Sequence, residues 1–276
     1  MVFYVRQRLS GSTTRSAGTC GHYDAAVPTP SVPGTEVHAR TATRLHPRAG
    51  APTSADSHIG GPMRSPADEP WPHCVDPLPD GSLGQALLGV AQFYRQDFPM
   101  LPFPAGGDLL QVFWCPAVYD DDHHHGYEPI ALRLFWRDSL GLNDPDLDQP
   151  KPVLVHEEAV PDHPCALRPC QVTEYPHPYD AKELGFEPDD DWPELADGSK
   201  IGGWIPWYQT GPMTFPCPDC EMDSVLMLSL HTREETDGCS CETDETGVGW
   251  QFGREGALNI LVCPNNVEHR PTPWID

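Results

Sequence analysis

Residues 110–116 read LQVFWCP and residues 258–264 read LNILVCP, so a short apolar run ends in Cys-Pro twice, 148 residues apart. Apolar runs of this length that end at a turn residue are typical of buried β-strands. The two runs align without a gap. They indicate that the chain contains two copies of one β-unit, each with a strand that ends in Cys-Pro. Internal repetition of this kind is a strong guide to the fold.

Three further matches accompany this pair in the same order and at nearly constant spacing. They are Ile59-Gly60-Gly61 with Ile201-Gly202-Gly203, Cys74 with Cys217, and LLGVAQFY (87–94) with VLMLSLH (225–231). A unit of three or four strands leaves an apolar face in water until another layer covers it. We therefore predict two related β-units, over about 58–136 and 200–276 with a connector at 137–199, that form one pseudo-symmetric domain.

Turn-forming residues shape the rest of the folded region. The 33 prolines and 24 glycines occur all along the chain and disfavour long helices, so short strands joined by turns are expected. Besides the repeated segments, we predict strands over 108–116, 131–136 and 171–175. Residues 180–198 are acidic and interrupted by Pro188 and Pro193, so this segment has room for one or two short helical turns.

The first 57 residues differ in composition from the remainder. From residue 8 onward they consist mainly of Ser, Thr, Ala, Pro and Arg, without an apolar period. Such a segment buries too little apolar surface to offset the entropy of ordering it. We predict that residues 1–57 are a disordered or non-native arm, and that the folded domain covers 58–276.

The net charge of −24 is concentrated in the folded region. Residues 1–58 carry six arginines and three acidic residues, so residues 59–276 hold a net −27. This charge repels phosphates and anionic lipid, which argues against nucleic-acid and membrane partners and favours a basic protein partner. No stretch approaches the roughly 20 apolar residues that cross a bilayer, and MVFYV is too short for a signal peptide. We expect a soluble, cytoplasmic protein.

The best candidate for a functional site is a set of cysteines in the second half. Cys217-Pro218-Asp219-Cys220 is followed by Cys239-Ser240-Cys241, a spacing that falls one residue short of a zinc ribbon. A second quartet is equally open. If 258–262 runs antiparallel to 225–230, Cys263 arrives beside Cys220, and His269 becomes a fourth ligand. The predicted metal ligands are therefore Cys217, Cys220, Cys239, Cys241, Cys263 and His269, with zinc in a structural role.

Other polar motifs do not predict catalysis. Asp120–His125 reads DDDHHH, but consecutive residues cannot all converge on one ion, so a solvated loop is favoured. His156-Glu157-Glu158 lacks the second histidine of a zincin, because Val160 stands at that position. The chain has no phosphate-binding loop and no nucleophile elbow. We predict no catalytic and no cofactor-binding residues.

Tryptophans lie on or beside several predicted strands and are expected to fill the core. Trp204 and Trp207 follow Gly202-Gly203, and for these two an exposed role as anchors of a protein interface is an alternative.

The segments IGGPMRSPADEPWP, LPFPAGGDLLQVFWCP, KIGGWIPWYQT and GALNILVCP resemble the YwqG-like family of bacterial proteins, in particular its actinobacterial members with extra cysteines. The resemblance covers roughly residues 58–276. It implies an α+β, strand-rich fold with internal pseudo-symmetry. It transfers no catalytic residue, because the family is a domain of unknown function. Some members resemble genes sited near toxin systems, which suggests an immunity or accessory role.

These features favour a non-enzymatic, acidic protein-binding module with a structural zinc ion. One alternative is a metal-dependent enzyme, in which the Cys and His ligands leave a coordination position open for water. Another is a small-molecule binder in the cleft between the halves, lined by Trp and Tyr.

Overall fold

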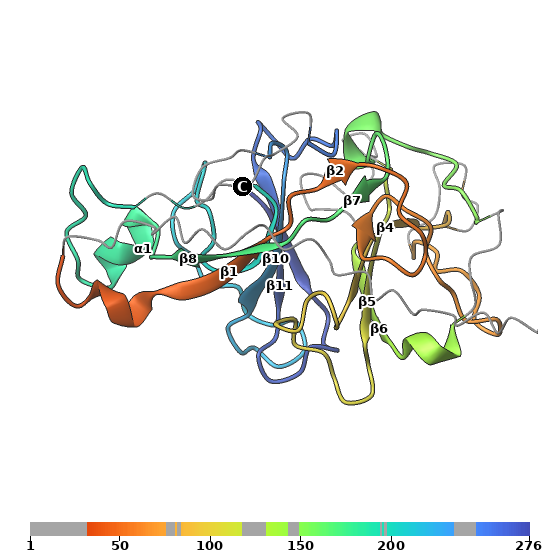
Figure 1. The fold of residues 1–276 in the computed structure, drawn as a ribbon, viewed down its shortest axis with the longest axis horizontal. Coiled ribbons are helices and arrows are strands. Elements are labelled where there is room, and N and C mark those ends of the chain that lie inside the picture. Colours follow the sequence, from red (N-terminus) through yellow and green to blue (C-terminus); the bar gives the residue numbers. More distant parts are fainter. Residues whose placement is uncertain are drawn as a thin grey trace, which may run out of the picture.

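Two six-stranded antiparallel sheets form the framework of the computed structural model (Figure 1), which describes residues 32–75, 81, 84–117, 131–142, 149–193, 195, 198–234 and 247–276. Sheet A has the order β12-β11-β10-β9-β1-β8, and sheet B has the order β2-β7-β3-β4-β5-β6. The strands are β1 (Arg40–Arg44), β2 (Arg48–Ala49), β3 (His58–Ile59), β4 (Leu88–Tyr94), β5 (Leu109–Trp114), β6 (Arg133–Arg137), β7 (Cys165–Ala166), β8 (Cys170–Glu174), β9 (Lys200–Gly202), β10 (Val225–His231), β11 (Ala257–Val262) and β12 (Thr272–Ile275).

Helix content is low, as the prolines predict. The described helices are α1 (Pro178–Glu183) and three 3-10 turns over Thr35–His38, Ser139–Gly141 and Glu157–Ala159. Pro178 stands in the first turn of α1, where its missing N–H costs nothing, and the His177 side chain accepts the Tyr179 N–H. The strands predicted over 87–94, 108–116, 131–136, 171–175, 225–231 and 258–264 are confirmed as β4, β5, β6, β8, β10 and β11.

The prediction that residues 1–57 form a disordered arm is wrong for the described residues 32–57. β1 lies inside sheet A, where it pairs with β8 on one side and β9 on the other. Ala42 and Leu45 are fully buried. Sequence reasoning missed this strand because RTATR has little apolar content, and the strand is ordered by backbone hydrogen bonds to two neighbours rather than by its own apolar surface.

β1 and β2 form one two-stranded ribbon with β8 and β7 that passes from sheet A into sheet B (Figure 1). The pairing register is continuous, since Arg44 pairs with Cys170 and Arg48 pairs with Ala166. The segment 137–199 is therefore more than a connector between two halves. It supplies β7 to sheet B and β8 to sheet A.

Beyond the ribbon, the two sheets share one strand order. β3-β4-β5-β6 in sheet B corresponds to β9-β10-β11-β12 in sheet A. The register between β4 and β5 shifts between Gly89 and Ala91, and that between β10 and β11 shifts between Leu226 and Leu228. Each Ile-Gly-Gly strand also pairs with one strand of the ribbon, β3 with β7 and β9 with β1.

The core lies between the inner faces of the two sheets. One apolar cluster contains side chains of both, including Ile59, Val112 and Trp114 of sheet B and Ile201, Leu228 and Ile260 of sheet A. The rings of Trp114 and Trp250 lie 5.7 Å apart. Trp204 and Trp207 are also buried, so their alternative role as exposed anchors is wrong.

The outer faces of both sheets carry buried polar side chains. In sheet A, Arg44 pairs with Lys200, Lys200 with Ser229 and Ser229 with Asn259. We call these four residues polar row A. In sheet B, His58 pairs with Gln92 and Gln92 with Gln111, which form polar row B. Paired residues on adjacent strands point to the same side of a sheet. All seven side chains are nearly or fully buried, so each outer face is covered by other segments.

Gly203 gives a test of this packing. Its φ is +77°, and a Cβ there would clash with Glu174 Oε2 and lie 2.9 Å from Ala42 Cβ. We expect Gly203→Ala to lower the free energy of unfolding by about 2 kcal/mol or more. Gly211→Ala is the matched control, because no atom lies within 4 Å of the added methyl group and its φ is not positive. Urea unfolding followed by tryptophan fluorescence measures both, and equal stabilities would contradict the packing.

Candidate functional site

Two turns at one end of sheet A bring cysteines together. Cys217 and Cys220 lie in the turn before β10, and Cys263 directly follows β11. Val225 pairs with Val262 in the antiparallel ladder, so the start of β10 and the end of β11 are adjacent. The first turn is closed by the Cys217 N–H, which donates to Met222 O (2.7 Å). This is the arrangement in which sequence reasoning places Cys263 beside Cys220.

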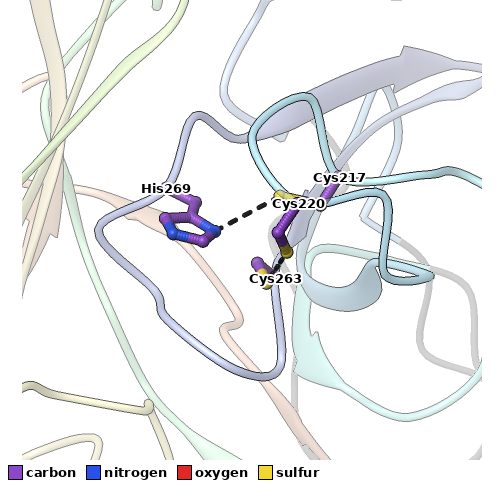
Figure 2. Close-up of side chains that lie close together, drawn as sticks. All are labelled: Cys217, Cys220, Cys263 and His269. Carbon is purple, nitrogen blue, oxygen red and sulfur yellow. Dashed lines mark hydrogen bonds between the residues drawn. The ribbon is translucent and has the colours of Figure 1, made fainter.

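Four side chains converge at this end of the sheet (Figure 2). The ligand atoms of Cys217, Cys220, Cys263 and His269 all lie within 4.8 Å of one another. Cys217 Sγ is 3.5 Å from His269 Nδ1, and the sulfurs of Cys220 and Cys263 are 3.4 Å apart. In a tetrahedral zinc site with Zn–S of about 2.3 Å and Zn–N of about 2.0 Å, such atom pairs are roughly 3.5–3.8 Å apart. The geometry therefore fits a metal ion.

The three thiols differ in the direction in which their surroundings shift the pKa. Burial of Cys217 opposes ionisation, but the backbone amides of Asp219 and Cys220 and the His269 ring outweigh it and lower its pKa. Cys263 behaves alike: burial opposes ionisation, while the amides of Asn266 and Asn265 lower its pKa. For Cys220 the Met222 amide favours the thiolate, but the neighbouring Cys263 and Cys217 sulfurs and burial raise its pKa. A divalent cation among the sulfurs would stabilise all three thiolates.

An ion pair between Arg270 and Asp219 connects the two loops that carry the candidate metal ligands. Arg270, the residue after His269, donates through its backbone N–H and its Nε to the two carboxylate oxygens of Asp219, at 2.7 and 2.8 Å. Its guanidinium also donates to Pro218 O (3.0 Å). The hydrogen bonds from Arg270 lower the pKa of Asp219. These hydrogen bonds therefore connect the loop that holds His269 to the Cys217–Cys220 turn.

The structure brings together four of the six predicted ligands. Cys239 and Cys241 lie outside the described residues, as do Asp120–His125. His156 precedes the 3-10 turn over Glu157–Ala159 and is half-buried, while Glu158 is exposed on the turn. The two side chains lie 3.9 Å apart. Among the described residues, the cluster at Cys217 is the group whose side chains meet the geometry for a metal ion.

The first half has cysteines at the corresponding positions. Cys74 and Cys115 align in sequence with Cys217 and Cys263, and both are buried in one apolar cluster with Phe113. Gln85 Nε2 donates to Cys115 Sγ (3.3 Å). Within the described ranges, no group of three metal-binding side chains includes either cysteine. The two halves thus differ in the number of ligands that gather at this position.

Sequence reasoning missed a buried charged pair on the outer face of sheet A. Lys200 Nζ donates to both carboxylate oxygens of Glu174, at 2.7 and 2.8 Å, and both side chains are almost fully buried. Glu174 Oε2 also accepts the Trp204 N–H (2.9 Å). The signal in the sequence is that Lys200 directly precedes Ile201-Gly202-Gly203, a segment that aligns with the buried strand β3.

Glu234 is a second buried carboxylate near this pair, and its Oε2 accepts the Ser199 N–H (2.9 Å). Burial raises the pKa of Glu234 to about 7, against the opposing effects of the Ser199 hydrogen bonds and the Arg44 charge. Between the ordinary value of 4.5 and about 7, the folded protein keeps a proton that the unfolded chain has released. The free energy of unfolding therefore falls as the pH rises through this range.

We expect Glu234→Gln to remove this loss of stability at high pH, since glutamine carries no charge at any pH. The variant should gain more stability relative to the wild type at pH 8 than at pH 5, by up to about 3 kcal/mol. Guanidinium unfolding at the two pH values measures the difference. The same stability difference at both values would contradict the buried, titrating carboxylate.

An open depression of about 450 Å³ lies between α1 and the segment 209–212. Its lining residues are Tyr179, Lys182, Gln209, Thr210, Gly211 and Pro212. Both walls are formed by segments that follow strands of sheet A, β8 and β9, so this depression is distinct from a cleft between the two halves.

No protein-family model matches the chain, and no curated protein matches it in sequence. None of the helices in the described ranges is long and apolar enough to cross a membrane.

Proposed function

We propose that this chain is a non-enzymatic protein-binding module, with an accessory or immunity role, in which one structural zinc ion holds the loops at the end of sheet A. The observation that carries the zinc proposal is the convergence of three thiols and one imidazole within 4.8 Å. A thiolate-rich tetrahedral donor set suits zinc. Four protein ligands complete its coordination, which favours a structural role over the alternative of a metal-dependent enzyme.

The proposed partner is a basic protein. The net charge of −27 over residues 59–276 supports this, because such a surface attracts cationic proteins and repels nucleic acid. The attraction depends on salt, since charges separated by more than about 8 Å are screened at physiological ionic strength.

Metal content tests the zinc proposal. The untagged protein is purified without a nickel column, because His123–His125 would carry nickel over, and metals are measured by mass spectrometry. We expect one zinc ion per chain, retained through dialysis. Protein that is folded and fully stable without bound metal, and that gains no stability from added zinc, would overturn the proposal.

A pull-down from lysate at about 50 mM and about 300 mM salt tests the partner. A cationic protein should be retained at low salt and released at high salt. Recovery of no cationic protein under either condition would overturn the binding role, and it would leave the metal measurement unaffected.

The relationship between the two sheets is also a proposal. We propose that they arose by duplication of one β-unit and that the chain is a cytoplasmic member of the YwqG-like family. The shared strand order and the matching register shifts support the duplication. The thiols of Cys217, Cys220 and Cys263, which lie close together without forming a disulfide, support a reducing compartment.

A further inference from the structure

A second site lies on the outer face of sheet A, beside polar row A. We call it the polar patch and define it as His231, Ala257, Asn259, Trp274 and Asp276. His231 pairs with Ala257, and Asn259 pairs with Trp274. The backbones of Ala257 and Asp276 exchange two hydrogen bonds, at 2.9 and 3.1 Å. Because paired residues and residues two apart on a strand face the same side, the five side chains share one face.

Four polar atoms of the patch have no hydrogen-bond partner among the described residues: His231 Nε2, Asn259 Nδ2, Trp274 Nε1 and Asp276 Oδ1. His231, Asn259 and Asp276 are at least 97% buried. His231 Nδ1 accepts the Gly198 N–H (3.2 Å), so the proton of the neutral ring lies on Nε2. The patch therefore presents three N–H donors and one carboxylate oxygen.

The corresponding face of sheet B is an internal control. There, Gln92 Nε2 donates to Ser54 O and Asp56 O, and Gln111 Nε2 donates to Arg64 O. Arg137 Nε donates to Gln111 Oε1 (3.0 Å). The buried amides of polar row B are thus satisfied within the protein, as buried polar groups usually are. The unpaired donors of the polar patch therefore contrast with the satisfied amides of polar row B, and they point to a ligand.

Tyr208 covers the patch and separates it from solvent. Its N–H donates to Asp276 Oδ2 (2.9 Å), and its hydroxyl lies 3.1 Å from His231 Nδ1. Tyr208 is 43% exposed, and the next four residues line the open depression beside α1. Thr210 lines the depression, and its buried Oγ1, like the four atoms of the patch, has no hydrogen-bond partner among the described residues. The segment 208–212 is therefore the layer that a ligand has to displace.

We propose that the polar patch binds a small molecule with a carboxylate next to an ammonium group, the chemistry of a free α-amino acid. The carboxylate oxygens accept the N–H groups of His231, Asn259 and Trp274. The ammonium group faces Asp276 Oδ1, because a buried carboxylate needs a donor or a positive charge, and Lys200 is already paired with Glu174. The ligand enters from the depression as residues 208–212 move aside. This site does not depend on the metal.

Thermal-shift and calorimetric titrations of the full chain test the proposal, with the 20 amino acids, lactate and ethanolamine as ligands. We expect at least one amino acid to bind and raise Tm, while lactate and ethanolamine, which each lack one of the two groups, bind at least tenfold more weakly. Lactate binding as tightly as alanine would overturn the ammonium contact. Absence of binding by every amino acid at 10 mM, with ordered water on the four atoms in a crystal structure, would overturn the ligand site.

Two variants locate the binding. Trp274→Phe removes one N–H donor and should weaken binding about tenfold. Ala257→Val fills the middle of the patch and should abolish binding. Gly141→Ala is the control outside the patch and its covering segment, because an added methyl group there meets no atom within 4 Å, and it should bind as the wild type does. If Ala257→Val does not fold, Trp274→Phe decides the result, and unchanged affinity in it would place the ligand elsewhere and overturn the proposal.

Discussion

Replacing Cys263 with serine is expected to abolish zinc binding and to lower Tm by about 10 °C. Free metal at a thousand times its Kd stabilises a folded protein by about 4 kcal/mol. One kcal/mol corresponds to about 2–4 °C in a domain of this size. Cys263 is fully buried and its sulfur lies 3.4 Å from that of Cys220, so serine removes one ligand from the centre of the cluster.

Cys115→Ser is the matched control, because Cys115 holds the equivalent position after β5 and is buried in sheet B. This variant should keep one zinc ion per chain, whatever its own effect on Tm. A chelator should lower the Tm of the wild type and of Cys115→Ser, and leave that of Cys263→Ser unchanged. Full zinc content in Cys263→Ser, or a chelator effect of equal size in it, would show that the metal lies elsewhere.

Replacing Lys200 with methionine is expected to cost about 3–5 kcal/mol of unfolding free energy, because it leaves the Glu174 carboxylate buried without its partner. The pair is almost fully buried, and the carboxylate also accepts the Trp204 N–H. Guanidinium unfolding measures the change. Glu174→Gln should be destabilising for the converse reason, since the ammonium group then loses its counter-charge.

A double variant separates the pair from its surroundings. Glu174→Gln combined with Lys200→Met should lose less than the sum of the two single variants, because it removes both buried charges together. Arg233→Met is the control for an exposed ion pair, since Arg233 and Glu255 are 59% and 58% exposed, and it should change stability by less than about 1 kcal/mol. Equal losses in Lys200→Met and Arg233→Met would contradict the burial of the Glu174–Lys200 pair.

The proposed functions concentrate in sheet A. The metal cluster lies at one end of β10 and β11, where Val225 pairs with Val262. The polar patch begins at the other end, where His231 pairs with Ala257. Sheet B shares the strand order but holds Cys74 and Cys115 in an apolar cluster and satisfies its polar row internally. The two sheets therefore differ in the thiols and unpaired polar groups that they present.

The sequence by itself determined the strands with strong apolar patterns. Runs such as 87–94 and 258–264 are apolar and bounded by Pro or Gly, and both are buried strands next to the core. The sequence also named Cys217, Cys220, Cys263 and His269, but it left two quartets open. Spacing along the chain does not say which loops meet, and the antiparallel pairing of β10 with β11 decides it.

Only the tertiary structure decided the place of β1 and of the buried polar groups. RTATR lacks an apolar period, so its position inside sheet A depends on backbone hydrogen bonds to β8 and β9, which local composition does not encode. Lys200, Glu174 and Asn259 have the composition of a solvated surface. They are buried because the segments between β9 and β10 fold over the outer face of the sheet, and a polar residue is satisfied there only by partners distant in the sequence.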